Sequence, residues 1–407
     1  MMSGIYRSPG SSKCLQILDL LSVLLVSESP GGTAAISIYR AASEHIEVWY
    51  SKGRPSTKAE KASVVNFIRS AVEATLVSRP ETEHLLRIAL DMCKYKVFAR
   101  IYQARQLLLQ LCLDGTYGII PSASYADRDL RDAAKIELRG VLGEDELPPE
   151  RSLERCLTLW FQDIILAVRP GVPFDIAANV EFYFQTVVRC YALLKLPRID
   201  TMIESDLLEK LRKVSEYYTA VSFVHWEVQK LSPGGKAHLI SSIREIPPSA
   251  PTTCFTPLDP LICLSNWAYY RGLTPPFPFH PSLPALPNQS HITECTHPEA
   301  TLITKIISTH KSSPAALREI GASKASCWIC QEFLAAARGL YPNISIRLLK
   351  ERLRTAGSWK FPAGTPVELV RALTRRIEKA MGEVLEECDG ANGVKGTVKR
   401  KFGGVEG

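Results

Sequence analysis

The pattern of apolar and polar positions changes several times along the chain, and its first part predicts a helix followed by two strands. Residues 14–26 form an apolar run, interrupted by Gln16 and Asp19, that is typical of a helix packed on a protein surface. After a Ser-Pro-Gly-Gly break, residues 34–39 and 46–51 are rich in β-branched and aromatic side chains. Their connection is short, so the two segments are predicted to pair as a hairpin.

From Thr57 the period of the apolar residues becomes helical. Thr57-Lys58-Ala59-Glu60 is a capping-box sequence, in which the Thr hydroxyl and the Glu carboxylate satisfy N–H groups at the helix end. Further helical patterns follow at about 81–113, 127–142, 152–168, 174–194 and 200–231. Residues 57–245 are therefore predicted to form an all-helical segment, and the absence of a fixed-period repeat argues against a solenoid.

Residues 246–290 differ in composition, because 11 of the 27 prolines in the chain lie between Pro247 and Pro287. Aromatic residues such as Phe255 and Trp267 are interleaved with these prolines. Proline lacks an N–H and fixes φ, so the segment is predicted to be an extended linker that docks on a surface. A proline-motif ligand for a partner domain is the alternative interpretation.

The last third of the chain alternates short elements. The pattern predicts a helix from Pro298, a strand at about 322–326, a helix from Cys327, a strand at about 344–349 and a final helix. In the final helix, Thr365 is expected to be the cap, Pro366 the first residue and Glu368 the partner in a capping box. Beyond it, the Gly-rich basic residues 389–407 predict a disordered tail.

Composition limits the class of protein only broadly. A chain of 407 residues with 46% hydrophobic and 22% charged residues can bury a sizeable core. Its net charge of +7 permits an anionic substrate without requiring one. The 11 scattered cysteines indicate reduced thiols in an intracellular protein, cytoplasmic or nuclear, and no apolar run is long enough to span a membrane. The oligomeric state stays open.

The candidate chemistry lies in His297-Pro298-Glu299 and, further along, Cys327-Trp328-Ile329-Cys330. A catalytic zinc ion needs three protein ligands, an open position for water and a carboxylate that moves the proton of that water. Zinc-dependent nucleobase deaminases carry this set as H-x-E followed by P-C-x-x-C. The motif therefore predicts zinc ligands at His297, Cys327 and Cys330, with Glu299 as the catalytic acid and base.

Local geometry agrees with these assignments. Pro298 favours the first position of a helix and disfavours helical angles in the residue before it, which places His297 at the N-cap. Glu299 shares a helix face with the apolar Leu302 and Ile303, where an unpaired carboxylate is unfavourable. Alternatively, Glu299 is a solvent-facing residue favoured by the helix dipole. If a helix begins at about Cys327, its positive end favours the thiolate form that binds zinc.

The predicted reaction is hydrolysis of an amidine carbon, with cytosine or adenine as the usual target and ammonia as the leaving group. Trp328, Trp359 and Phe361 are candidate base-stacking residues, although each also suits a protein core.

Two other interpretations use the same residues. In one, Cys295 joins His297, Cys327 and Cys330 in a closed structural zinc site, and the protein is a non-catalytic interaction protein. In the other, the C-x-x-C sequence is a thioredoxin-type redox pair. The first leaves Glu299 without a role, and the second leaves both His297 and Glu299 without one.

At these residues the chain resembles the zinc-dependent cytidine/nucleotide deaminase superfamily, in particular a fungal branch related to bacterial toxin-type deaminases. The resemblance is carried by residues 320–330 (Ile-Gly-Ala-Ser-Lys-Ala-Ser-Cys-Trp-Ile-Cys) and, more weakly, by Gly-Ser-Trp-Lys-Phe-Pro at 357–362. It implies the same zinc ligands and a proton shuttle at Glu299. Two departures are Ser326 in place of the usual proline and Pro298 in place of a small or aliphatic residue.

The family fold is an α/β/α sandwich that opens with a helix and two strands. The resemblance therefore implies a discontinuous three-layer α/β/α cytidine-deaminase-like domain with a large all-helical insertion. The expected sections are a core part at 1–56, the insertion at 57–245, a linker at 246–290, the zinc-binding core at 291–388 and the tail at 389–407. The substrate implied is a nucleobase within a nucleotide, nucleoside or nucleic acid.

Overall fold

The computed structural model of the chain describes residues 13–26, 32–40, 46–74, 78–113, 132–133, 135–136, 141, 160–162, 180–231, 240–250, 252–255, 291–294, 296–310, 318–324, 326–342, 346–348 and 359–391. The helical patterns predicted at 127–142 and 152–168 lie largely outside them, as do residues 256–290 and 392–407.

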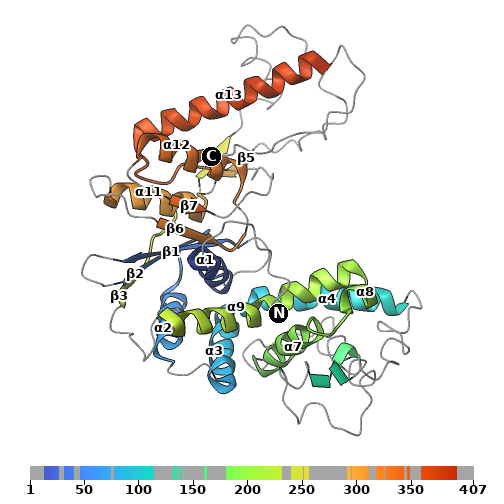
Figure 1. The fold of residues 1–407 in the computed structure, drawn as a ribbon. Coiled ribbons are helices and arrows are strands. Elements are labelled where there is room, and N and C mark those ends of the chain that lie inside the picture. Colours follow the sequence, from blue (N-terminus) through green and yellow to red (C-terminus); the bar gives the residue numbers. More distant parts are fainter. Residues whose placement is uncertain are drawn as a thin grey trace.

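A five-stranded mixed sheet lies at the centre of the described structure, with strand order β3-β2-β1-β6-β7 (Figure 1). Its strands are β1 (Ala34–Arg40), β2 (Ile46–Lys52), β3 (Ile240–Glu245), β6 (Arg318–Ala322) and β7 (Ile346–Leu348). Strand β1 runs antiparallel to β2 and β6, whereas the β2–β3 and β6–β7 pairs are parallel. The predicted hairpin of residues 34–51 is thus confirmed.

Alternate residues of the hairpin point to opposite faces of the sheet. Ile36 pairs with Tyr50, and both are buried in one core, whereas Ala35 and Trp49 are buried in the core on the opposite face. Because both faces of the sheet are covered, both sets of alternating side chains are apolar, which agrees with the β-branched and aromatic residues from which the hairpin was predicted.

Helices cover both faces of the sheet (Figure 1). On one face lies α1 (Lys13–Leu24), and beyond it pack α2 (Lys58–Glu73), α3 (Arg79–Met92), α4 (Lys94–Leu113), α7 (Val180–Leu193), α8 (Ile199–Met202) and α9 (Ser205–Leu231). On the other face lie α11 (Pro298–His310), α12 (Trp328–Leu340) and α13 (Val367–Ala391). None of the helices within the described ranges is long and apolar enough to cross a membrane.

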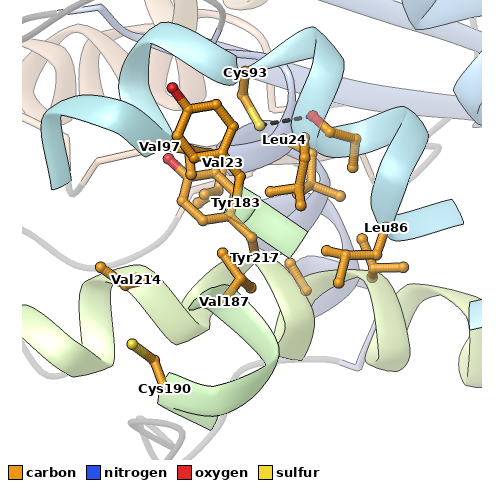
Figure 2. Close-up of a cluster of buried hydrophobic side chains, with 14 of the residues drawn as sticks. Val23, Leu24, Leu86, Cys93, Val97, Tyr183, Val187, Cys190, Val214 and Tyr217 are labelled. Atoms are coloured by element: carbon orange, nitrogen blue, oxygen red, sulfur yellow. Dashed lines mark hydrogen bonds between the residues drawn. The ribbon is translucent and has the colours of Figure 1, made fainter. Parts of the chain in front are cut away.

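The helical segment shares its core with α1 rather than forming a separate body. Figure 2 shows Val23 and Leu24 of α1 in the same cluster as Leu86 of α3 and Tyr217 of α9. Tyr183 of α7 is also fully buried in this cluster. Because buried apolar area is the main stabilising term, the helices and the sheet are expected to stabilise each other.

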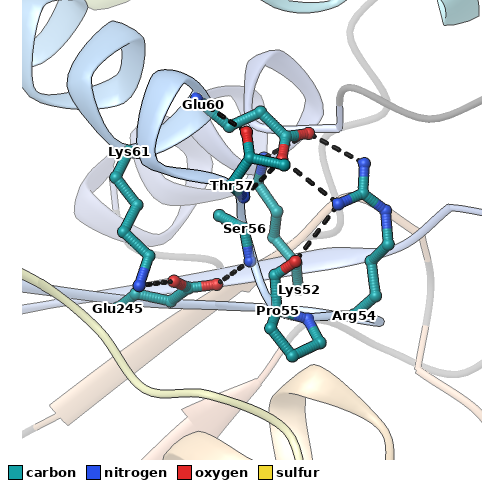
Figure 3. Close-up of polar contacts among 8 residues, drawn as sticks. All are labelled: Lys52, Arg54, Pro55, Ser56, Thr57, Glu60, Lys61 and Glu245. Atoms are coloured by element: carbon teal, nitrogen blue, oxygen red, sulfur yellow. Dashed lines mark hydrogen bonds and ion pairs between the residues drawn. The ribbon is translucent and has the colours of Figure 1, made fainter.

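The helical segment leaves and rejoins the sheet at neighbouring points. Glu245, the last residue of β3, accepts the Ser56 N–H at 2.7 Å and pairs with Lys61 of α2 at 2.9 Å (Figure 3). The predicted capping box is present, with Thr57 and Glu60 bonded reciprocally. Adjacent entry and exit points are typical of a segment inserted into another domain.

Several secondary-structure predictions need correction, and β3 is the first. The all-helical segment was predicted to extend to residue 245, but residues 240–245 form a strand parallel to β2. Ile240 and Ile243 are three residues apart, which suits a helix. A register shift at the start of the β2–β3 pairing inserts an extra residue, so both isoleucines pack against the same core despite that spacing.

The other corrections are smaller. The helix predicted at 81–113 is divided at Cys93, whose thiol donates to the carbonyl oxygen of Ala89 (Figure 2). The linker contributes β4 (Thr252–Phe255), which pairs with β5 (His291–Glu294). Strand β6 ends at Ala322, where a strand at 322–326 was predicted, and the helix predicted at 200–231 is divided into α8 and α9. Helix α13 begins at Val367 and not at Pro366; the Thr365 hydroxyl donates to the Pro362 carbonyl, and the Glu368 carboxylate accepts the Tyr341 hydroxyl. Neither Gly nor Pro marks the break at Cys93, so local signals could not locate it.

Strand β6 is held against α1 by a very close backbone contact. A Cβ atom on Gly321 would lie 2.1 Å from the carbonyl carbon of Leu18 and 2.4 Å from the nitrogen of Asp19. Only glycine allows this approach, and β6 leads directly into the loop before Cys327.

We therefore predict that Gly321→Ala destabilises the protein by roughly 2 kcal/mol or more, because the backbones must move apart. The measurement is the free energy of unfolding in urea. Gly339→Ala is the control, since its Cβ would meet nothing within 4 Å, and its stability should be unchanged or slightly higher. Equal stability of the two variants would contradict the prediction.

A second contact joins the same elements. The Asp19 carboxylate accepts the Ala322 N–H at 2.9 Å. Burial raises the pKa of Asp19 from 3.8 to about 7, although the bond from Ala322 partly opposes this, and the nearby Glu319 adds to it. The folded protein therefore binds a proton at Asp19 at pH values where the unfolded chain has released it.

The free energy of unfolding should consequently fall as the pH rises from 3.8 towards 7, by at most about 1.4 kcal/mol per pH unit from this group. Asp19→Asn keeps an acceptor for Ala322 but does not titrate. Urea unfolding of both proteins between pH 5 and pH 8 should show the variant gaining stability relative to the wild type as the pH rises. The gain should level off above about pH 7, where Asp19 of the folded wild type has lost its proton. Parallel pH profiles would show that Asp19 does not titrate as inferred.

Candidate metal centre

The first part of the candidate site is the start of α11. This helix begins at Pro298, as predicted, and the His297 carbonyl accepts the Thr301 N–H at 3.0 Å. His297 therefore occupies the N-cap position, outside the helical backbone, and its ring lies beyond the helix end. Ala300, Leu302 and Ile303 are fully buried and fix this helix against the sheet.

The second part is the start of α12. Cys327 is the N-cap with an extended backbone (φ −74°, ψ 161°), and Cys330 is the third residue of the helix. Cys330 is fully buried in the same core cluster as Phe333, Leu334 and Ala337 of this helix. The two cysteines consequently approach the same point, one from the cap and one from the first turn.

His297, Cys327 and Cys330 come together in the structure. The His297 Nδ1 atom lies 3.4 Å from the Cys327 sulfur and 3.3 Å from the Cys330 sulfur. The three candidate ligand atoms all lie within 4.8 Å of one another, and they could hold a metal ion. Within the described residues, no other group of three or more His, Cys, Asp or Glu side chains is placed to hold a metal ion in this way.

The spacing of these atoms fits zinc. With Zn–N near 2.05 Å and Zn–S near 2.3 Å, tetrahedral coordination places nitrogen and sulfur about 3.6 Å apart. The observed 3.3 and 3.4 Å are slightly shorter, so only a small relaxation is needed. Three protein ligands also leave one tetrahedral position for water, as catalytic zinc requires and structural zinc does not.

Glu299 lies on the buried side of α11, as its alignment with Leu302 and Ile303 predicted. It is 5% exposed, and its Oε2 atom is buried without a hydrogen-bond partner among the described residues. Burial raises the pKa of Glu299, while its own backbone N–H and the neighbouring His297 act in the opposite direction. A buried carboxylate oxygen without a partner is unfavourable, so it calls for a functional explanation.

The three ligand candidates share charge and protons. The pKa of the Cys327 thiol is lowered to about 4, mainly because the Cys330 thiol donates a hydrogen bond to it, and His297 contributes in the same direction. That hydrogen bond, together with burial, raises the pKa of Cys330. Burial opposes protonation of His297, but its bond to Cys327 and the charge of Cys327 raise its pKa overall. The site thus favours a positive charge next to the Cys327 thiolate, and a bound metal ion would supply such a charge.

Aromatic residues close one side of the site. The Trp359 Nε1–H donates to the Cys330 sulfur at 3.4 Å. Trp359 and Phe361 also pack against the buried Phe333, with ring centroids of Phe333 and Trp359 5.6 Å apart. Of the proposed base-stacking residues, these two are therefore part of the core beside the ligands, and Trp328 is half-buried at the first position of α12.

The loop before Cys327 is held by polar contacts that sequence reasoning missed. The Gln331 side chain donates to the Ser326 hydroxyl, and the Gln331 N–H donates to the Cys327 carbonyl at 3.2 Å. Ser326, which stands where proline is usual, is almost fully buried. The Ser326–Gln331 contact thus restrains the residue before the first cysteine by a side-chain clamp. Cys295, the fourth ligand of the structural-zinc alternative, lies outside the described residues.

Residues 296–363 match a family model described as OTT_1508-like deaminase. The matched region contains all four predicted site residues and both elements that position them, although it is a minor part of the chain. No curated protein and no solved structure matches the chain. The match supports a deaminase-type domain in this region.

We predict that the purified wild-type protein retains about one zinc ion per chain after dialysis. His297→Ala and Cys330→Ala should each lose most of it, because two remaining ligands bind zinc weakly. Cys190→Ala, which removes a buried thiol of α7, should keep the full zinc content. Metal analysis by mass spectrometry, with circular dichroism to confirm folding, gives the answer. A wild-type protein without zinc would contradict the assignment.

Proposed function

We propose that this protein is a zinc-dependent hydrolytic deaminase that acts on a nucleobase of the cytosine or adenine type. The observation that carries the proposal is Glu299, a buried carboxylate with an unpartnered oxygen beside the His297, Cys327 and Cys330 set. A closed structural zinc site has no use for such a carboxylate. A hydrolytic zinc site requires one, because a proton must leave water and reach the leaving group.

In this proposal His297, Cys327 and Cys330 hold the zinc ion. When bound, zinc supplies Lewis acidity that lowers the pKa of a water molecule and so provides a nucleophile near neutral pH. Glu299 accepts a proton from water at Oε2 and returns it to the substrate. In the net reaction, water adds to the amidine carbon, the bond to the exocyclic nitrogen breaks, and a carbonyl group and ammonia result.

The neighbouring residues have supporting roles. Trp359 donates to the Cys330 sulfur, which stabilises the thiolate and fixes its direction. Phe333, Trp359 and Phe361 exclude water from the buried side of the ligands, so charges there interact strongly. Ser326 and Gln331 keep the N-terminus of α12 in place.

The proposal includes the fold type and the branch of the deaminase superfamily. The sheet order and the helices on both faces support a discontinuous α/β/α cytidine-deaminase-like domain, with the helical segment as the insertion. The family match supports deaminase chemistry, and the 320–330 tract supports the closer likeness to fungal and toxin-type deaminases. The choice of cytosine or adenine is left to the assay.

The alternative is a non-catalytic interaction protein with a structural zinc ion. It shares the ligand set, so zinc content alone does not separate the two functions. A redox pair, in contrast, would not need the His297 ring in contact with both sulfurs.

We predict that Glu299→Gln retains zinc but lowers ammonia release by about 10²- to 10⁴-fold, the usual contribution of a general acid–base group. The assay measures ammonia and the mass change of a nucleoside, nucleotide and oligonucleotide panel. Glu332→Gln is the matched control, because Glu332 lies on α12 and pairs with Arg376 at the surface. Undiminished activity of Glu299→Gln would exclude the proposed role, and a wild type inactive on every substrate would favour the structural alternative.

A further inference from the structure

The segment that follows β3 packs on the face of the sheet that carries the candidate metal centre. The Ile246 N–H donates to the Tyr50 carbonyl at 2.7 Å, which extends the pairing of β3 with β2. The Ile246 side chain packs against the core formed by α11, α12 and α13, and Pro248 is buried. Residues 246–250, the crossing segment, therefore connect the edge of the sheet with the metal-centre face.

Ser249 of the crossing segment bonds two parts of the chain that flank the metal centre. Its N–H donates to the Thr296 hydroxyl at 3.2 Å, and its own hydroxyl accepts the Ala363 N–H at 2.6 Å. A longer contact, from the Lys360 ammonium to the Ala250 carbonyl at 3.4 Å, joins the crossing segment to the second of these parts again. Because both bonds come from one residue, Ser249 limits the separation of the two parts that it joins.

Thr296 connects the first bond to a candidate metal ligand. It comes directly before His297 and is almost fully buried. Strand β5, which leads towards it, pairs with β4, so that Thr252 lies opposite Glu294. On the other side, the His297 carbonyl accepts both the N–H and the hydroxyl of Thr301, at 3.0 and 3.2 Å. The backbone of His297 is thus held by α11 on one side and through Thr296 on the other.

Ala363 connects the second bond to the cysteine ligands. It lies two residues after Phe361, whose ring packs edge-on against Trp359 with the centroids 4.9 Å apart. Trp359 in turn donates to the Cys330 sulfur. A displacement of Ala363 would therefore move the aromatic pair that closes the cysteine side of the site.

We propose that Ser249 is a positioning residue of the metal centre, which holds the His297 side and the Trp359–Cys330 side of the site at a fixed separation. Ser249 acts through Thr296 and Ala363 and is not itself a ligand. Ligand side chains must be held to within a fraction of an ångström, and the groups that orient them have measurable effects on metal binding. Only the consequence for catalysis rests on the proposed deaminase function.

The position of Ser249 makes this contact particular to the chain as a whole. Residues 296–363 match the deaminase family model, and Ser249 lies outside them. Both of its partners, Thr296 and Ala363, are the end residues of the matched region. The crossing segment therefore joins the two ends of the deaminase-type region from outside it.

The first experiment needs no bound metal. It measures, by peptide mass spectrometry, how fast iodoacetamide alkylates each cysteine of the metal-free full-length protein. Ser249→Ala removes the acceptor of the Ala363 N–H, so the fully buried Cys330 should react about threefold faster or more, through increased local opening. Cys190, buried in the core of the helical segment, is the internal reference and should react at its wild-type rate.

Three further variants test the bridge itself. Ser249→Thr keeps the N–H and the hydroxyl and should restore the wild-type rate. Ser308→Ala is the matched control, because this α11 hydroxyl donates to Lys305 of its own helix at 2.9 Å and joins no other element. Thr296→Val removes the other end of the bridge and should act like Ser249→Ala. The two effects should not add in the double variant, because either change breaks the bridge.

The second experiment follows the transfer of zinc to a chromogenic chelator. Ser249→Ala should release zinc about threefold to tenfold faster than the wild type, a smaller effect than that of groups bonded directly to a ligand. With cobalt in place of zinc, the thiolate-to-cobalt absorption bands of Ser249→Ala should shift, because they report the geometry of the cysteine ligands. Ser308→Ala should match the wild type in both measurements.

Two results would overturn the inference. One is a Ser249→Ala protein whose Cys330 reactivity and zinc release equal those of Ser308→Ala. The other is a parallel rise in the reactivity of Cys190 and Cys330, which would mean that Ser249 stabilises the fold as a whole and has no particular role at the site.

The same variants separate this inference from the proposed function. If the wild type releases ammonia and Ser249→Ala keeps both its kcat and the wild-type Cys330 reactivity, the positioning role is refuted and the deaminase proposal stands. If Ser249→Ala changes Cys330 reactivity but no substrate yields ammonia, the positioning role is supported and the deaminase proposal is refuted. In an active enzyme Ser249→Ala should lower kcat more than it raises KM, because displaced ligands act on the transition state.

Discussion

The contact of one imidazole nitrogen with two cysteine sulfurs is the constraint on which the rest of the structure depends. His297 and the cysteine pair are at the N-termini of α11 and α12, so both helices must pack on the same face of the sheet with their starts at one end. A displacement of about an ångström in the position of a ligand side chain weakens both metal binding and catalysis at such a site. The buried faces of both helices, and the aromatic group around Phe333, provide the required rigidity.

The opposite face of the sheet controls the same site indirectly. Gly321 and Asp19 fix β6 against α1, and β6 leads through Ser323 and Lys324 to Cys327. Helix α1 is in turn part of the core formed by the helical segment. The position of the cysteine pair therefore depends on packing in a layer that contributes none of the candidate metal ligands.

Much of the site could be predicted because its signals are local. Pro298 marks the start of α11, the C-x-x-C sequence marks the start of α12, and the apolar residues after Glu299 indicate its burial. The hairpin was predictable for a similar reason, since both strands are rich in β-branched and aromatic residues and the connection between them is short.

The features that sequence reasoning missed are non-local. Residues 240–245 become a strand only because β2 lies beside them, and a register irregularity hides their alternation. The bond from Trp359 to Cys330 and the bond from Ala322 to Asp19 join segments that are separated in the chain. No pattern within a short window of sequence reports such pairs, so they become visible only in the folded structure.

The pairing of β1 with β6 has a consequence for the order of folding. The bond between Ala34 and Ser323 joins residues 289 positions apart, with the whole helical segment between them. During synthesis the β1–β2 hairpin must wait, with one edge of β1 unpaired, until β6 has left the ribosome. Contacts of such high sequence separation form slowly, whereas helices fold from local contacts. The metal centre should accordingly be the last part of the molecule to assemble, and the exposed edge of β1 is the point at which a nascent chain is most exposed to aggregation.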